Sequence, residues 1–277
     1  MKIGITGQNG FVGWHLSKTI KYFHPNDFQL IPFERIFFSN PNSLDNFASK
    51  CDCIVHLAGL NRAKDERQIS KVNIALTKQL TESFKRINYK GKLIFSSSAH
   101  EKNDSSYGAS KKEARQVFIN ASEKIGFEFS GLIIPNIFGP FCKPNYNSFI
   151  ATFCEKIINK IEPVITVDNE IELLYVGILV EEIIKNINKP SNSNLIIAPQ
   201  KNIKVSHILK KLNTFNNQYI VKGEIPQLDS MFDLHLFNTF KSYLNFEEKY
   251  PIKHKENIDD RGSFSEIVRS KASGQVS

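Results

Sequence analysis

Along roughly the first two-thirds of the chain, short apolar runs alternate with stretches in which apolar residues recur at helical spacing. Short runs rich in β-branched residues, such as KIGIT, are typical of buried parallel strands. Between these runs, apolar residues recur three or four positions apart, which predicts amphipathic helices. The predicted strands are Lys2–Thr6, Phe28–Pro32, Cys53–Leu57, Lys92–Ser97 and Glu128–Ile134, and the predicted helices are Phe11–Phe23, Glu66–Ile87 and Tyr107–Ile125. This alternation predicts the α/β class, with a doubly wound parallel sheet covered on both faces.

The pattern becomes less regular after Asn136. Helical spacing returns in three stretches, Ser148–Asn159, Leu179–Ile187 and Val205–Leu212. We expect residues 1–250 to combine the sheet with a smaller mixed C-terminal region that binds substrate, and residues 251–277 to form a separate segment. Within that segment, Gly262–Ser277 has strand-forming residues but no sheet of its own, so we expect it to be mobile or to add to another sheet edge.

The composition is that of an ordinary globular protein, with 41% hydrophobic and 23% charged residues. No apolar stretch reaches the roughly 18 residues that a membrane helix needs, and the opening MKIGITG lacks the apolar core of a signal peptide. We therefore expect a cytoplasmic protein without membrane insertion. The net charge of +8 comes from scattered lysines, without a zinc finger or an RNA-binding motif, which argues against a nucleic-acid partner.

The cysteines and histidines show no metal-binding or disulfide pattern. Four cysteines, Cys51, Cys53, Cys142 and Cys154, are too few and too unevenly spaced for a disulfide framework, so we expect buried thiols. Most histidines are too dispersed for ligand spacing, and His100 is interpreted as a loop residue. We therefore expect no metal site.

A glycine-rich turn follows the first predicted strand and opens the first predicted helix. Its residues are Gly7, Gly10, Phe11, Val12 and Gly13. Without a Cβ, the glycines let the backbone approach a pyrophosphate held at the helix N-terminus. The spacing is GxxGxxG, one residue longer than the GxGxxG fingerprint. The turn predicts a Rossmann-type dinucleotide site.

The residue after the second strand selects the cofactor in such sites, because an arginine there can bind the 2′-phosphate of NADPH. The sequence reads PFER, and Arg35 favours NADPH. Glu34 would instead pair with an unphosphorylated ribose, so NADH remains open.

A YxxxK pair, Tyr107 and Lys111, points to hydride transfer. Reduction of a ketone needs an acid that gives a proton to the developing alkoxide, and helical i,i+4 spacing places both side chains on one face. At about 5 Å and an effective dielectric of about 20, the lysine would stabilise a phenolate by roughly 3 kcal/mol. We therefore expect Lys111 to lower the pKa of Tyr107 toward working pH.

The glycine turn and the YxxxK pair together resemble the extended short-chain dehydrogenase/reductases. The resemblance implies that Ser98, the third serine of FSSSAH, positions the carbonyl oxygen and that Lys111 also bonds the nicotinamide ribose. It places Asn73 of KVNIALT behind the site. It also implies that the adenosine pocket is walled by HLAG, whose last residues are Leu57, Ala58 and Gly59.

The segment PNIFGPFCKPNYNSFIATFCEKI (Pro135–Ile157) is more specific. It resembles the bifunctional capsular-polysaccharide enzymes of UDP-N-acetyl-L-fucosamine synthesis, and Asn257–Ser277 resembles the start of their cupin domain. The resemblance implies NADPH-dependent reduction of the C4 ketone of a UDP-2-acetamido-2,6-dideoxy-4-ketohexose in a homodimer. The implied contacts to the UDP-sugar are Arg62, Ser98, Asn136, Lys143 and Asn145.

Three features depart from the resembled pattern. Ile133 stands where that family has an arginine, and Gly177-Ile178 stands where it has an acidic pair. The histidines of the cupin metal site are absent from the sequence, so we expect reduction without the epimerising activity. Two alternatives remain open: an NAD-dependent sugar-nucleotide epimerase or dehydratase, and a noncatalytic NADP(H)-binding remnant. Ala99-His100 lacks the carboxylate pair of a dehydratase, and the complete serine, tyrosine and lysine set argues against the remnant.

Overall fold

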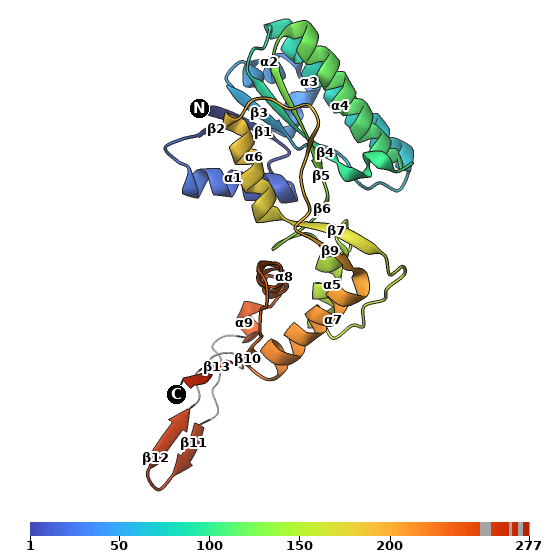
Figure 1. The fold of residues 1–277 in the computed structure, drawn as a ribbon. Coiled ribbons are helices and arrows are strands. Elements are labelled where there is room, and N and C mark those ends of the chain that lie inside the picture. The colour runs from blue at the N-terminus through green and yellow to red at the C-terminus, as the bar shows by residue number, and fades with distance from the viewer. Residues whose placement is uncertain (250–255, 266–267, 271–273, 277) are drawn as a thin grey trace. The chain divides into compact units, whose positions relative to one another are not determined.

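The chain divides into two compact units, which are described separately here (Figure 1). The first contains Met1–Ile137 and Val176–Pro199, and the second contains Phe138–Tyr175 and the described part of Gln200–Ser277. The computed structural model describes residues 1–249, 256–265, 268–270 and 274–276.

A six-stranded parallel sheet forms the centre of the first unit, which confirms the predicted fold class. Its strand order is β2-β1-β3-β4-β5-β8, so the chain reverses direction across the sheet between β1 and β3. Ligands bind at such switch points, outside the carboxyl ends of the strands. The strands are β1 (Lys2–Thr6), β2 (Gln29–Ile31), β3 (Cys53–His56), β4 (Lys92–Ser98), β5 (Glu128–Ile134) and β8 (Leu195–Ile196).

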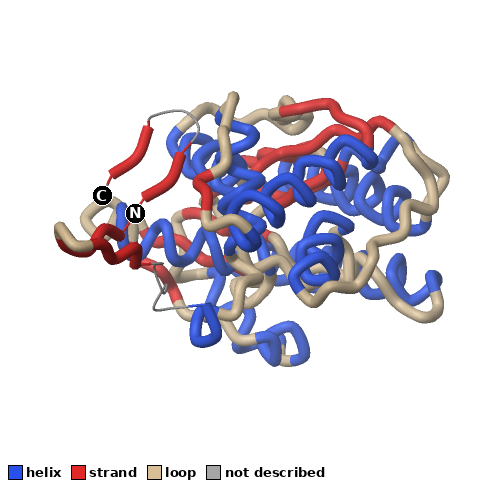
Figure 2. The backbone as a smooth tube through the Cα atoms, turned by 90° about the horizontal axis from the view of Figure 1, so that it is seen from below, coloured by secondary structure: helices blue, strands red, loops and turns tan. Residues whose placement is uncertain are grey.

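Helices cover both faces of this sheet (Figures 1 and 2). On one face lie α1 (Phe11–Phe23) and α6 (Val176–Asn188), which pack together. On the other lie α2 (Pro41–Ala48), α3 (Glu66–Ile87) and α4 (Ser106–Ile125). Two short 3₁₀ turns, η1 (Arg35–Ser39) and η2 (Ala99–Lys102), follow β2 and β4. The predicted bounds of α1 and α3 are confirmed, and α4 begins one residue earlier than predicted.

Capping residues explain why α3 and α4 begin and end where they do. The side chain of Asp65 accepts the Arg67 N–H before α3, and the Ser105 hydroxyl accepts the Gly108 N–H before α4. Asn88 and Gly126 then take left-handed backbone conformations that end the two helices.

The second unit has its own core beneath a small sheet. Buried aromatic residues from its helices, including Phe153, Phe215 and Phe240, pack with Phe138. The sheet contains β6 (Asn136–Phe138), of which Phe138 is the first residue of this unit, β7 (Glu170–Tyr175) and β9 (Lys201–Lys204). The helices are α5 (Phe149–Ile158), α7 (Val205–Phe215), the π-helical turn η3 (Asn216–Val221), α8 (Met231–Lys241) and α9 (Phe246–Lys249). The predicted helices over α5 and α7 are confirmed, whereas α8 was not predicted.

The last described segments form short strands. A hairpin joins β11 (Glu256–Asp259) to β12 (Gly262–Ser265), while β13 (Val268–Ser270) pairs in parallel with β10 (Glu224–Ile225) and antiparallel with β14 (Gly274–Val276). The expectation that Gly262–Ser277 has no sheet of its own is wrong, because β13 and β14 pair with each other and form a three-stranded sheet with β10. β12 likewise pairs with the adjacent β11 rather than with the edge of a distant sheet. Residues 266–267, 271–273 and 277 of the same prediction lie outside the described residues.

Three of the four cysteines are buried as expected. Cys51, Cys53 and Cys154 are buried free thiols, whereas Cys142 is half-buried. Burial raises the pKa of Cys51 and of Cys53 to about 12, so both stay protonated and unreactive at neutral pH. Within the described residues, the structure contains no helix with both the length and the apolar character needed to span a membrane.

Candidate functional site

The turn between β1 and α1 is too tight for side chains at two of its glycines. Gly7 has φ +80°, and a Cβ there would lie 2.7 Å from the Ala58 amide nitrogen. A Cβ at Gly13 would lie 2.2 Å from the Gly7 carbonyl oxygen. Gly10 closes the turn by donating its N–H to the same oxygen at 2.9 Å. The backbone is therefore bare at the start of α1, which a dinucleotide pyrophosphate requires.

The first turn of α1 is open to an anion. Gly10 provides no side-chain cap, and the first turn contains no acidic residue. Phe11 and Val12 are half-buried beside it. The partial positive charge of the helix N-terminus is thus left without a negative side chain of its own.

The end of β3 forms a wall beside this turn. Leu57 donates its N–H to the Thr6 carbonyl at 3.0 Å, and Ala58 donates to the Thr6 hydroxyl at 3.4 Å. The same hydroxyl lies 2.7 Å from His56 Nδ1. Burial lowers the pKa of His56 to about 3, so this imidazole is neutral at working pH. The structure therefore brings HLAG next to the glycine turn.

The glycine turn is also tied to the end of β2 by a residue that sequence reasoning missed. Gln8 donates its side-chain N–H to the Phe33 carbonyl at 2.7 Å. Arg35, the residue expected to select the cofactor, begins η1 two positions later and is exposed, as is Glu34. No motif marked Gln8, because a glutamine in a loop has many other uses.

Lys111 is buried against the end of β4. Its Nζ donates to the Ser96 carbonyl at 2.8 Å and lies 4.8 Å from the centre of the Phe95 ring. A Cβ built at Gly59 would be 3.6 Å from this Nζ, so the wall after β3 adjoins the lysine. Burial lowers the pKa of Lys111 to about 8, against an opposing effect of the Glu101 carboxylate.

The expectation that Lys111 lowers the pKa of Tyr107 is wrong. Burial raises that pKa to about 12, and a hydrogen bond with the Ser98 side chain lowers it only partly. The Lys111 Nζ is 5.8 Å from the Tyr107 ring centre, and it donates its hydrogen bond to the Ser96 carbonyl rather than to the phenol. The desolvation of the phenol therefore outweighs the expected stabilisation of its phenolate. The Ser98, Tyr107 and Lys111 set is nevertheless assembled at the carboxyl end of β4.

Asn73, on α3, forms hydrogen bonds behind the Ser98, Tyr107 and Lys111 set. Its amide accepts the Leu60 N–H at 2.7 Å and donates to the Leu60 carbonyl at 3.0 Å. It also donates to the Ser110 hydroxyl on α4 at 3.0 Å. Asn73 thus connects the loop after β3 to the helix that carries Tyr107 and Lys111.

The turn η2 packs closely on the start of α4. A Cβ at Gly108 would lie 2.0 Å from the His100 carbonyl oxygen, so this contact requires glycine. His100 Nε2 lies 3.1 Å from Asn136 Oδ1, and its Nδ1 lies 3.1 Å from Asn103 Nδ2. The interpretation of His100 as a simple loop residue missed this link between η2 and Asn136. Its sequence neighbourhood gave no signal of a partner far along the chain.

The other expected substrate residues lie in both units. In the first unit, Arg62 is exposed in the loop between β3 and α3, next to Asn61. The Asn61 Oδ1 is buried without a hydrogen-bond partner among the described residues, which is costly unless a ligand supplies a donor. In the second unit, Asn145 donates its side-chain N–H to Glu155, and Lys143 lies near the ring of Tyr146. Substrate roles for Arg62, Asn136, Lys143 and Asn145 stay predictions.

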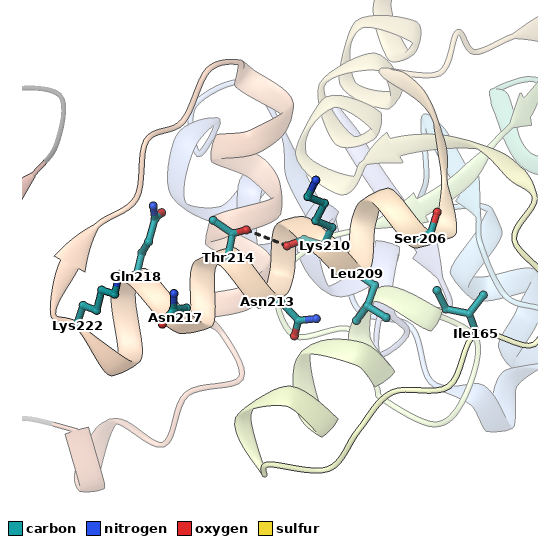
Figure 3. A pocket seen from close by; sticks show the side chains of 9 residues that line it. All are labelled: Ile165, Ser206, Leu209, Lys210, Asn213, Thr214, Asn217, Gln218 and Lys222. Atoms are coloured by element: carbon teal, nitrogen blue, oxygen red, sulfur yellow. Dashed lines mark hydrogen bonds between the residues drawn. The ribbon is translucent and has the colours of Figure 1, made fainter.

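A separate groove of about 600 Å³ lies on α7 and η3 in the second unit (Figure 3). Its walls combine the apolar side chains of Ile165 and Leu209 with polar side chains that include Lys210 and Lys222. Thr214 donates its hydroxyl to the Lys210 carbonyl at 3.0 Å. It contains none of the residues expected to bind cofactor or substrate. Among the described residues, no three His, Cys, Asp or Glu side chains are close enough together to hold a metal ion.

Known proteins share this sequence and geometry. The model of the NAD dependent epimerase/dehydratase family matches residues 3–197. The chain is 32% identical over 282 residues to the UDP-2-acetamido-2,6-beta-L-arabino-hexul-4-ose reductase of Pseudomonas aeruginosa, an alignment that covers the whole chain and 74% of that protein.

Solved structures agree with this match. The capsular polysaccharide assembling protein CapF from Staphylococcus aureus aligns with a TM-score of 0.80 and 31% identity, over 99% of this chain and 73% of that one. RMD from Pseudomonas aeruginosa, complexed with NADPH, shares the fold with a TM-score of 0.73 at 16% identity, over 87% of this chain and 98% of that one. The family match, the curated relative and the site geometry agree that the chain belongs to the NAD dependent epimerase/dehydratase family.

Proposed function

We propose that this protein reduces the C4 ketone of a UDP-2-acetamido-2,6-dideoxy-4-ketohexose with NADPH. The observation that carries the proposal is the Ser98, Tyr107 and Lys111 set beside the glycine turn. It occurs in a chain that is 32% identical over its full length to a UDP-sugar 4-ulose reductase. The similar structure of CapF, a capsular polysaccharide assembling protein, supports a role in polysaccharide assembly.

The residues of the first unit fit a dinucleotide. The bare turn at Gly7 and Gly13 and the uncapped start of α1 suit a pyrophosphate, and the loop after β3 suits the adenosine. Arg35 would hold the 2′-phosphate, and Lys111 would bond the ribose next to the nicotinamide. NADPH supplies the hydride when it is bound.

The side chains of the site handle the proton and the carbonyl oxygen. With a pKa near 12, Tyr107 holds its proton at every working pH and is ready to give it to a strongly basic alkoxide. Ser98 donates a hydrogen bond that holds the carbonyl oxygen toward Tyr107. Loss of the proton leaves a phenolate, which the Lys111 ammonium stabilises from the same helix face.

The remaining expectations concern the sugar nucleotide and the assembly. A net charge of +8 favours an anionic UDP-sugar, which Arg62, Asn136, Lys143 and Asn145 would contact. Residues 1–250 would form the catalytic part and residues 251–277 the start of a cupin domain. The protein would be a cytoplasmic homodimer that binds no nucleic acid, and sedimentation of the purified chain would test the dimer.

Replacing Tyr107 by Phe tests the proposed function directly. We expect turnover of NADPH with the 4-keto sugar nucleotide to fall by about 10²-fold or more, because the proton donor is lost. NADPH affinity should be nearly unchanged, because the glycine turn is intact. The matched control is Tyr22→Phe, at an exposed position on α1. Turnover by Tyr107→Phe within about threefold of wild type would exclude the assigned role.

A further inference from the structure

A buried ion pair lies one helical turn beyond Lys111, and neither the family motifs nor the proposed chemistry uses it. Arg115 donates from Nε to Glu101 Oε1 at 2.9 Å and from Nη2 to Oε2 at 2.5 Å. The arginine side chain is 14% exposed and the glutamate side chain 8%. Burying both charges is costly, and apolar side chains often stabilise a protein as well as such a pair does. Stability alone therefore does not explain why the pair is there.

Several further contacts hold the pair in one geometry. The Ser97 hydroxyl, at the end of β4, donates to Glu101, and Arg115 also donates to the Asn194 side chain just before β8. Gly131 in β5 leaves room for the arginine, because a Cβ there would lie 2.9 Å from Arg115 Cδ. The pair is thus held from β4, from β5 and from the residue before β8, all in the first unit.

The two partners belong to the two elements that carry the catalytic set. Glu101 lies in η2, three residues after Ser98, and Arg115 lies on α4. Tyr107, Lys111 and Arg115 follow one another at i,i+4 spacing, so they share a helix face. We propose that the Glu101–Arg115 pair is the positioning element of this site, which holds Ser98 against Tyr107 and keeps a carboxylate beside Lys111.

The charges around Lys111 show what the carboxylate does. Tyr107 faces the lysine from its own helix, neutral His56 faces it from β3, and Glu101 faces it from η2. Burial lowers the pKa of Lys111 to about 8, and the Glu101 charge counteracts this lowering. Arg115 in turn lowers the pKa of Glu101, so the carboxylate stays ionised. The pair therefore helps Lys111 to remain an ammonium at neutral pH.

Two substitutions test the inference, which rests on the proposed function. In Glu101→Gln the lysine loses the nearby negative charge, so its titration should move to lower pH. In Arg115→Gln the carboxylate loses its partner and acts on Lys111 alone, so the titration should move to higher pH. Both variants should lower kcat at least about tenfold with little change in the KM for NADPH, because Ser98 is no longer held. General damage to the fold would not shift one titration in two opposite directions.

The titration of Lys111 is measured by NMR on isotope-labelled lysine, with Lys111→Met to assign the signal. This measurement needs no turnover, so it still decides the inference if wild type fails to oxidise NADPH with the 4-keto sugar and the proposed function is wrong. The matched control is Asp45→Asn, which breaks another two-bond pair, Arg86 with Asp45, between α2 and α3. A Lys111 titration that is unmoved in Glu101→Gln overturns the inference, whatever happens to the rate. If that variant does not fold, an unmoved titration in Arg115→Gln overturns it.

Discussion

Burial favours the neutral form of both ionisable side chains in the site. It raises the pKa of Tyr107 to about 12 and lowers the pKa of Lys111 to about 8. The group that changes charge near working pH is therefore the lysine, whereas the tyrosine remains a proton donor. A buried ammonium reduces the stability of the fold, which is a common feature of active sites.

We expect Lys111→Met to inactivate the enzyme and to stabilise it at pH 7. The folded pKa of about 8 lies below the unfolded value of about 10.4, so the burial cost is fully present below pH 8 and disappears as pH rises between these values. After subtraction of the lost hydrogen bond to the Ser96 carbonyl, the gain at pH 7 is on the order of 2 kcal/mol. Urea unfolding at neutral and alkaline pH measures it. A variant less stable than wild type at pH 7 contradicts this account.

Arg35 is exposed at the start of η1, and the proposed function assigns it to the 2′-phosphate of the cofactor. We expect Arg35→Ala to weaken NADPH binding by about tenfold and to leave NADH binding nearly unchanged, because only NADPH presents that phosphate. Fluorescence titration with each cofactor measures the two affinities, and Arg67→Ala on α3 is an exposed control. Equal losses for both cofactors would assign the preference to Glu34.

At the scale of elements, the site depends on how closely short turns approach helices. The turn η2 rests on the first turn of α4 at Gly108, and the β1 turn rests on the end of β3 at Gly7. Side-chain hydrogen bonds from Asn73 and Gln8 then fix the loops between these elements. Ser98, Tyr107 and Lys111 are consequently positioned by backbone contacts that leave no space for a methyl group.

Gly108→Ala should therefore affect catalysis more than stability. The new methyl group would lie 2.0 Å from the His100 carbonyl oxygen, so η2 must move and take Ser98 with it. We expect kcat to fall by about tenfold or more, while alanine suits the helix itself. The exposed neighbour Ala109 provides the control Ala109→Ser. Full activity in Gly108→Ala, measured as NADPH oxidation, would show that the position of η2 does not matter.

At the scale of the whole molecule, the sequence predicted the first unit better than the second. Strands such as Lys2–Thr6 and Glu128–Ile134 are buried on both faces, so their apolar runs are visible without knowledge of the fold. Strands of two residues, β8 and β10, pair with distant partners and have no local pattern. The Glu101–Arg115 pair was missed for a related reason. The sequence spacing of the two residues does not show that their side chains are buried and in contact.

Two separate cores predict two unfolding steps. One is built around Phe84 and Phe118, and the other around Phe153 and Phe240. We expect NADPH to shift only the transition of the first unit, by about 3 kcal/mol at about a hundred times its Kd, because the glycine turn lies in that unit. Calorimetry with and without NADPH measures the shift. A single transition that moves as a whole would mean that the two units unfold as one.

The first unit is discontinuous in sequence, and this has a consequence during synthesis. Its helix α6 and strand β8 are synthesised only after Phe138–Tyr175, a segment that belongs to the second unit. Until then α1 lacks the helix that packs against it, and β5 has an unpaired edge. A nascent chain of this protein therefore exposes the face of α1 and the edge of β5, both of which are prone to aggregation. This exposure lasts for the time needed to add the roughly sixty residues between β5 and β8, a few seconds at ordinary elongation rates. Chaperone binding should concentrate in that interval and end when β8 closes the sheet.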